Sequence, residues 1–333
     1  MKGFYSGKEQ NLQQHLTVIS IGGFDKENKR LWSADDLLPA VRYNFEGTDT
    51  KSPYFKGFVF SPVTVRDDYY IHPLYAGFGQ SPTKEDWEAY TNILFEPGYN
   101  LHALNELAVV PLDIWLGIPY PMKSQLNFGT LNGQSLSFQT QSMRKDALDW
   151  WLQSVMEHWK QAGLTNLQLK GFYWMREVLL PEDEELLVEL NDSIHAHSYK
   201  AMWLPNYGGY GAMNPWKGEA LNFDVTAVNP NYYGNTSLGP EWINHASLFS
   251  RVVGTGLQIN IGKGITFSPY HIYDYLNLGL PHRNNFINDC FLVFQFYDLS
   301  IREYLNEHKT EYQQIYNFMN KLYTEQSYPG RPY

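Results

Sequence analysis

Short apolar runs recur along the chain and alternate with segments of helical pattern. Most of the runs are continuously hydrophobic, which is typical of strands buried on both faces of a parallel sheet. Strands that alternate with amphipathic helices indicate repeated βα units. The runs are Leu16–Gly22, Gly57–Val63, Leu112–Pro119, Leu169–Trp174, Lys200–Leu204, Phe223–Val228, Gly256–Ile261 and Cys290–Tyr297.

The segments between the runs carry the signals of helix ends. Ser33 precedes Ala34–Val41 as a candidate N-cap, and Thr83 with Asp86 opens an amphipathic stretch through Phe95. In Asp146–Ala162, apolar residues recur at near-helical spacing. Further helices are predicted at Glu182–His197, Pro240–Val253, Pro269–Leu278, Ser300–His308 and Glu311–Tyr323.

We interpret the pattern as an α/β fold: a single (β/α)8 TIM-type barrel over residues 1–333. Two long insertions, about 64–111 and 122–145, are expected at its C-terminal rim. A doubly wound sheet also alternates strands and helices, but it usually carries a glycine fingerprint after its first strand. The segment Ile21-Gly22-Gly23-Phe24-Asp25 is no such fingerprint, so the barrel is favoured.

Composition excludes several classes of function. The net charge of −10 and the lack of a basic stripe argue against nucleic-acid binding. Cys290 is the only cysteine, which rules out an intrachain disulfide and a cysteine-clustered metal site. No apolar run is long enough for a membrane span. The N-terminus lacks the apolar run of a signal peptide, so we expect either a cytoplasmic protein or a processed, extracytoplasmic chain.

Aromatic residues are unusually frequent, at 16% of the chain with 25 Tyr and 10 Trp. Each of these two side chains combines a flat apolar face with a polar edge, which suits the faces and hydroxyls of sugars. A core rich in aromatics would give the same composition, and most of these residues are expected in the core. The rest are candidates for a carbohydrate site.

Residues at the C-terminal ends of barrel strands are the candidates for chemistry. Glu177 follows the fourth run, with Trp174 before it and Arg176 beside it. A carboxylic acid in such a partly apolar site can protonate a glycosidic oxygen. The alternative is an ordinary acidic residue in a loop or at the next helix start.

Neutral hydrogen-bonding and aromatic side chains gather at the other strand ends, as a hydroxyl-rich ligand would require. Turn formation by the Asn-Pro-Asn segment is an equally simple explanation for part of this pattern. The candidate substrate-binding residues are Tyr120, Trp174, Trp203, Asn206, Tyr207, Asn229, Asn231, Tyr232, Gln258 and Asn260.

Five motifs lie near the ends of the predicted strands: Ile118-Pro119-Tyr120-Pro121, Gly171-Phe172-Tyr173-Trp174-x-x-Glu177, Trp203-Leu204-Pro205-x-Tyr207, Phe223-Asp224 and Asn229-Pro230-Asn231-Tyr232. Together they resemble a bacterial family known as domain of unknown function 4855, whose motif order and spacing match this chain from about Leu16 to Tyr297. The family is similar to (β/α)8-barrel glycoside hydrolases. The resemblance therefore implies that fold, action on polysaccharide and Glu177 as the acid.

The seventh strand departs from the family pattern. Where the resemblance implies Gly-x-Glu-x-Glu, this chain has Gly256-Leu257-Gln258-Ile259-Asn260. A retaining glycosidase needs a second carboxylate, and an amide cannot form the glycosyl ester. Another acid could serve, with Asp298 as the first candidate and Asp25, Asp67 or Asp68 as others; the substrate could supply its own nucleophile; or the barrel could bind glycans without cleaving them.

The sequence therefore predicts a glycoside hydrolase-like protein that acts on an oligo- or polysaccharide. Glu177 and Asp298 are the catalytic candidates, and no metal or organic cofactor is implied. The alternative is a catalytically impaired carbohydrate-binding barrel that lacks the seventh-strand carboxylate.

Overall fold

Eight parallel strands form a closed barrel, which confirms the predicted fold. The computed structural model describes residues 1–23, 29–75, 77–208, 218–233, 239–262, 269–297 and 300–328. Every predicted apolar run overlaps one barrel strand. The first strand pairs with both the second and the last, which closes the ring. The strands are β1 (His15–Ile21), β4 (Gly57–Pro62), β7 (Leu112–Ile118), β10 (Leu167–Trp174), β11 (Lys200–Trp203), β12 (Val225–Val228), β13 (Gly256–Ile261) and β14 (Leu292–Phe296).

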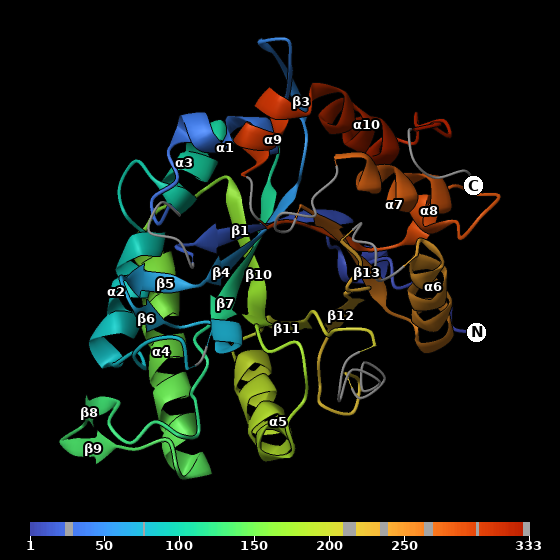
Figure 1. Ribbon diagram of the computed structural model, residues 1–333. Coiled ribbons are helices and arrows are strands. Elements are labelled where there is room, and N and C mark those ends of the chain that lie inside the picture. Colours follow the sequence, from blue (N-terminus) through green and yellow to red (C-terminus); the bar gives the residue numbers. More distant parts are fainter. Residues whose placement is uncertain are drawn as a thin grey trace.

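Helices surround the barrel strands (Figure 1). Three of them begin with a capping box, in which the N-cap and the third helical residue satisfy each other's backbone N–H groups: Ser33 with Asp36, Thr83 with Asp86, and Ser300 with Glu303. The helices are α1 (Ala34–Val41), α2 (Lys84–Leu94), α3 (Asn100–Leu107), α4 (Gln141–Gln161), α5 (Pro181–Ala196), α6 (Glu241–Val253), α7 (Ile272–Leu278), α8 (Phe286–Asp289), α9 (Ile301–Glu307) and α10 (Lys309–Met319).

Smaller strands occupy the long connections. The hairpin of β2 (Arg42–Phe45) and β3 (Thr48–Pro53) follows α1, and β5 (Thr64–Arg66) pairs with β6 (Tyr69–Tyr70) after the second barrel strand. A further hairpin, β8 (Gly129–Leu131) with β9 (Gln134–Leu136), extends from the body of the protein (Figure 1). The 3-10 helices are η1 (Lys8–Gln10), η2 (Pro73–Tyr75) and η5 (Pro269–His271).

The fourth and fifth barrel strands approach each other unusually closely at Gly171. A Cβ atom built at this position would lie 1.8 Å from the backbone oxygen of Lys200, so no other residue fits without moving β11. The pairing of β10 with β7 also shifts register between Leu169 and Gly171. This glycine therefore fixes how β10 lies in the barrel, and with it the residues that follow β10.

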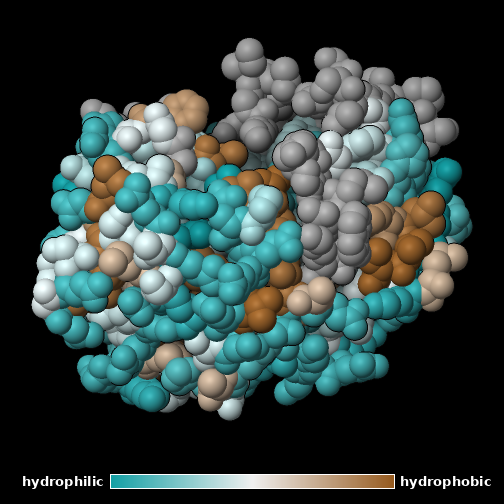
Figure 2. Space-filling view, turned by 90° about the horizontal axis from the view of Figure 1, so that it is seen from below, coloured by the Kyte–Doolittle hydropathy of each residue, from teal (hydrophilic) through white to brown (hydrophobic). Residues whose placement is uncertain are grey.

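The face seen in Figure 2 is largely hydrophilic, with hydrophobic residues scattered between polar ones. The large apolar side chains are mostly buried in one continuous core. Within the described ranges, no helix is both long and apolar enough to span a membrane.

Candidate functional site

Glu177 lies in the loop that joins β10 to α5, at the C-terminal end of the barrel. Its backbone oxygen accepts a hydrogen bond from Asn206 N over 3.0 Å, which ties this loop to the one that follows β11. Its side chain is half-buried, and Oε1 lies 3.4 Å from Nδ2 of Asn229, the residue after β12. The structure thus brings together residues from the ends of three successive strands, as expected for the functional end of a barrel.

The orientation of the Asn229 amide is set by a backbone group. Asn231 N donates to Asn229 Oδ1 over 2.8 Å, and Asn260 Nδ2 donates to the same oxygen over 2.8 Å. Because a backbone N–H can only donate, Oδ1 must face Asn231, and Nδ2 must point toward Glu177. The buried Asn229 amide is therefore a fixed hydrogen-bond donor to the carboxylate.

Amides on the last two strands continue this network. Gln258 Nε2 donates to Asn260 Oδ1 over 2.8 Å and to Gln295 Oε1 over 2.6 Å. Because both partner atoms are acceptors, the NH₂ group of Gln258 must face them and its oxygen must point away. Its Oε1 is then left buried without a hydrogen-bond partner among the described residues. An unsatisfied buried acceptor is costly, and a ligand hydroxyl or a water molecule would satisfy it.

Three tyrosines lie close enough to Glu177 to respond to its charge. Burial first, and then the Glu177 carboxylate, raises the pKa of Tyr233 to about 12, and the same two causes raise the pKa of Tyr173 further. Burial likewise raises the pKa of Tyr297, with smaller contributions from Tyr233 and Glu177. These phenols therefore stay protonated at neutral pH and can donate. Tyr233 OH already donates to Tyr297 OH over 3.2 Å.

Four of the predicted aromatic substrate-binding residues are buried, and their contacts are largely within the protein. Tyr120 OH donates to Asp183 Oδ2 over 2.9 Å, and Tyr232 OH donates to Asp274 Oδ2. Trp203 stacks on Phe223 and donates through Nε1 to a backbone oxygen. The ring of Trp174 packs edge-on against that of Tyr120. The contact of these four rings with a sugar stays a prediction.

The loop after β11 is less deeply buried. Tyr207 packs against Trp242 and Phe249 of α6, and its backbone N–H donates to Asn229 O over 2.7 Å. Asn206 forms an isolated bridge with Asn229, and its Oδ1 is buried without a partner among the residues described. Asn206 therefore adds a second free acceptor close to Glu177.

The structure describes only two of the four candidates for a second carboxylate, Asp67 and Asp68. Asp298 and Asp25 lie outside the described residues. Asp67 pairs with Arg30 at 2.8 Å on the surface, and Asp68 occupies a turn with φ 64°. Across the described part of the chain, no three His, Cys, Asp or Glu side chains gather as a metal site would require.

The site residues predicted from the sequence did not include Tyr173, Gln295 and Tyr297. Gln295 and Tyr297 accept hydrogen bonds from Gln258 Nε2, and Tyr173 lies close enough to Glu177 to respond to its charge. Alternation along the strands was the available signal. Phe172 packs outward on Trp151 of α4, so its neighbour Tyr173 faces the opposite side of β10. Gln295 and Tyr297 are likewise two residues apart on and just after β14.

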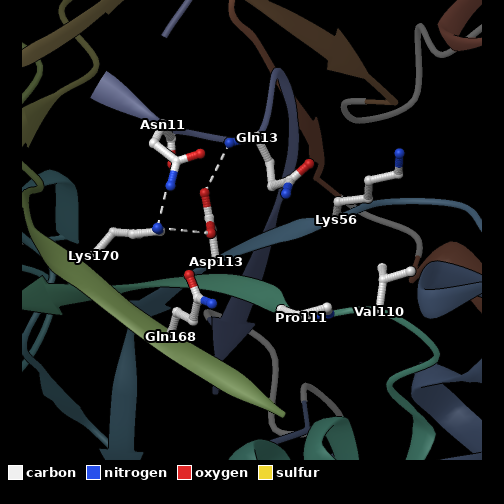
Figure 3. A pocket seen from close by; sticks show the side chains of 8 residues that line it. All are labelled: Asn11, Gln13, Lys56, Val110, Pro111, Asp113, Gln168 and Lys170. Carbon is white, nitrogen blue, oxygen red and sulfur yellow. Dashed lines mark hydrogen bonds and ion pairs between the residues drawn. The ribbon is translucent and has the colours of Figure 1, made fainter. Parts of the chain in front are cut away.

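A separate cavity of about 320 Å³ lies at the other end of the barrel, where the strands begin (Figure 3). There Asp113 Oδ2 accepts from Gln13 N over 2.8 Å, and Lys170 Nζ lies 3.4 Å from Asp113 Oδ1. In TIM barrels this end serves stability and the opposite end serves chemistry. We therefore place the candidate site around Glu177, away from this cavity.

A family model described as Domain of unknown function (DUF4855) matches residues 17–323. The match covers β1 except for its first two residues, and it covers the other seven barrel strands completely. The chain belongs to this family. The DUF4855 match spans the strand ends that carry Glu177, Asn229, Gln258 and Asn260. Comparison with curated protein sequences found no match.

Solved structures with a similar fold share little sequence with this DUF4855 chain. A GH18 chitinase from Pseudoalteromonas aurantia is 11% identical with a TM-score of 0.42, covering 92% of this chain and 99% of its own. A Group IV chitinase from Ostrinia furnacalis is 9% identical with a TM-score of 0.46, covering 92% and 98%. An endo-1,4-beta-xylanase from Caldicellulosiruptor owensensis is 9% identical with a TM-score of 0.40, covering 89% and 88%. TM-scores below 0.5 are too low to transfer any property to this chain.

Proposed function

We propose that this DUF4855 barrel acts on carbohydrate and that Glu177 is the general acid of glycosidic bond cleavage. The observation that carries the proposal is the placement of one half-buried carboxyl group among neutral hydrogen-bonding side chains at the C-terminal end of the barrel. A glycan offers many hydroxyls and no phosphate, so amides and protonated phenols suit it. A carboxyl group in that setting is the proton donor that glycoside cleavage needs.

In the proposed reaction, protonated Glu177 gives its proton to the glycosidic oxygen as the bond from that oxygen to the anomeric carbon breaks. A water molecule attacks the anomeric carbon and loses its proton to a second carboxylate, for which Asp298 is our candidate. Asn229 would hold the Glu177 carboxyl group in place. The unpartnered acceptors on Gln258 and Asn206 would receive sugar hydroxyls.

A second candidate function is glycan binding without cleavage. The observation in its favour is that Gln258 and Asn260 occupy the strand positions where the family resemblance implies acids, and that they are hydrogen-bonded to each other. If residue 258 were Glu, it would have no N–H group to donate to Asn260 Oδ1 and Gln295 Oε1. Its carboxylate would instead face these two acceptor oxygens, which is unfavourable. This network is therefore built for amides.

Incubation with a panel of bacterial and plant polysaccharides, followed by mass spectrometry of the released fragments, tests the proposal. The wild type should release fragments, and Glu177→Gln should lower turnover by roughly 10²- to 10⁴-fold while it still binds the same glycan. Glu157→Gln, on the exposed face of α4, is the matched control and should behave as wild type.

Each other outcome has a definite meaning. Equal turnover in Glu177→Gln and wild type would remove Glu177 as the acid. Binding by the wild type with no fragment from any glycan would favour the binding function. Neither binding nor cleavage of any carbohydrate would overturn both.

A further inference from the structure

Among the described residues, the guanidinium group of Arg176, which precedes Glu177, has no counter-ion. It lies over the ring of Tyr120, 5.0 Å from the ring centre, and its side chain is half-buried. Its Nε is buried without a hydrogen-bond partner, and no carboxylate of the described chain lies within ion-pair distance of it. Partly desolvated guanidinium groups normally have such partners, because an uncompensated charge away from water is costly.

The charges around Arg176 do not neutralise it. Asp183, which accepts the hydrogen bond from Tyr120 OH, is already paired with Arg144, and both of these side chains are almost fully buried. Arg144 also lies near the Tyr120 ring, at 5.9 Å. Two guanidinium groups and one carboxylate thus flank one phenol ring, which leaves a net positive charge.

His72, on the segment that leads into η2, faces the same group. Burial, and then the charge of Arg176, lowers the pKa of His72 from 6.5 to about 4, so this imidazole is neutral near pH 7. It therefore neither adds to nor cancels the charge. Glu177 forms no ion pair with Arg176, and in the acid form that the proposed reaction uses it carries no charge to compensate.

We propose that Arg176 binds an anionic group on the glycan, a carboxylate or a sulfate ester, on the sugar next to the scissile bond. The inference rests on the proposed function, because it places this group beside Glu177. A guanidinium presents parallel N–H donors that match a carboxylate or a sulfate in two-point contact, and its cation–π contact with Tyr120 helps to hold that fork in place. The hydrogen bond from Trp203 Nε1 to Arg176 O, at 2.7 Å, holds the backbone from which it projects.

The substrate would then be an acidic polysaccharide, despite the net charge of −10 on the chain. Long-range repulsion between exposed charges is screened within about 8–10 Å at physiological salt, so a local, partly buried cation can determine the choice of ligand.

The test compares matched ligands that differ only in charge. Oligogalacturonates are measured by calorimetry against their carboxyl-reduced forms, and sulfated chondroitin oligosaccharides against their chemically desulfated forms. We expect the wild type to bind at least one charged member about tenfold or more tightly than its neutral partner, as for loss of a charge-assisted contact. The pair that shows the preference identifies carboxylate or sulfate as the recognised group.

Variants assign that preference to one residue. Arg176→Gln should abolish it and leave binding of the neutral form unchanged, while Arg176→Lys should keep part of it. Arg283→Gln is the matched control, since it removes the same charge from a surface residue that pairs with Glu325. Circular dichroism confirms that each variant is folded.

Three results would overturn the inference: equal binding within both ligand pairs, a preference that survives in Arg176→Gln, or no binding of any charged ligand. These are separable from failure of the proposed function. Cleavage that depends on Glu177, together with equal binding of the charged and neutral members of each pair, would contradict only the role of Arg176. A charge preference that depends on Arg176, with turnover unchanged in Glu177→Gln, would sink only the role of Glu177.

Discussion

Asn229 holds the carboxyl group of Glu177 from one side, with Nδ2 lying 3.4 Å from Oε1. The amide cannot turn over, because its oxygen is occupied by Asn231 N and Asn260 Nδ2. A proton donor needs a fixed direction toward the oxygen it protonates. The geometry therefore makes Asn229 a positioning residue, which would act on the substrate through Glu177.

Replacing Asn229 with alanine tests that role. The variant loses the donor to Glu177 and the side-chain oxygen that accepts from Asn231 N and Asn260 Nδ2, which should cost about 1–3 kcal/mol of unfolding free energy. We expect kcat to fall by roughly tenfold or more while KM changes little, since the glycan contacts are kept. Steady-state kinetics and urea denaturation measure the two effects. A rise in KM at constant kcat would show that Asn229 contacts the substrate instead.

Asp298 directly follows Tyr297, whose hydroxyl belongs to the site network, and is our candidate for the second carboxylate. If it activates water, Asp298→Asn should lower kcat by about 10²- to 10⁴-fold and remove the acidic limb of the pH–rate profile. Retention of activity in this variant would assign the step to another acid, such as Asp25, or to the substrate itself.

The histidines predict loss of stability in mild acid. Burial is the main cause that lowers the pKa values of both His15 and His72 to about 4. The unfolded chain binds protons at these groups from about pH 6.5 downward, whereas the folded chain does not until about pH 4. The free energy of unfolding should therefore fall as the pH is lowered through this window.

Thermal melts between pH 7.5 and 4 measure that slope. His72→Gln should flatten it, because one of the two groups that take up protons on unfolding is removed. An NMR titration in which the His72 ring signals shift with a midpoint near pH 6.5 would contradict the assignment.

The buried pair of Arg144 and Asp183 predicts a strongly coupled mutant cycle. The two side chains are only 2% and 1% exposed, and Arg144 also donates to backbone oxygens of Pro121 and Glu182. Asp183→Asn alone should cost about 3–5 kcal/mol, because it leaves a buried guanidinium unpaired. Adding Arg144→Met should recover part of that loss. Additive costs in urea denaturation would mean that the pair is not coupled.

Most of the barrel could be predicted because its strands are buried on both faces and so appear as uninterrupted apolar runs. The strand bounds agree within a few residues, and the caps at Ser33 and Thr83 mark helix starts correctly. The hairpins β2–β3 and β8–β9 were missed, since their short strands are not buried on both faces and lack such runs. The helix α4 begins at Gln141 instead of Asp146, because its polar first turn shows no apolar periodicity.

The site was partly predictable for a topological reason. Parallel strands bring their C-terminal ends together, so Glu177, Asn229 and Asn260 meet although they are far apart in sequence. Partners that come from helices gave no local signal. The hydroxyls of Tyr120 and Tyr232 bind Asp183 on α5 and Asp274 on α7, and nothing in the sequence near either tyrosine indicates these contacts.

Closure of the barrel joins its first and last strands, because β1 pairs with β14 as well as with β4. During synthesis, one edge of β1 therefore stays unpaired until more than 270 further residues have been made. Exposed strand edges invite pairing with other chains. If the ribosome stalled before Leu292, β1 and β13 would each keep one unpaired edge. Synthesis of β14 therefore removes both of the edges through which the nascent protein could aggregate.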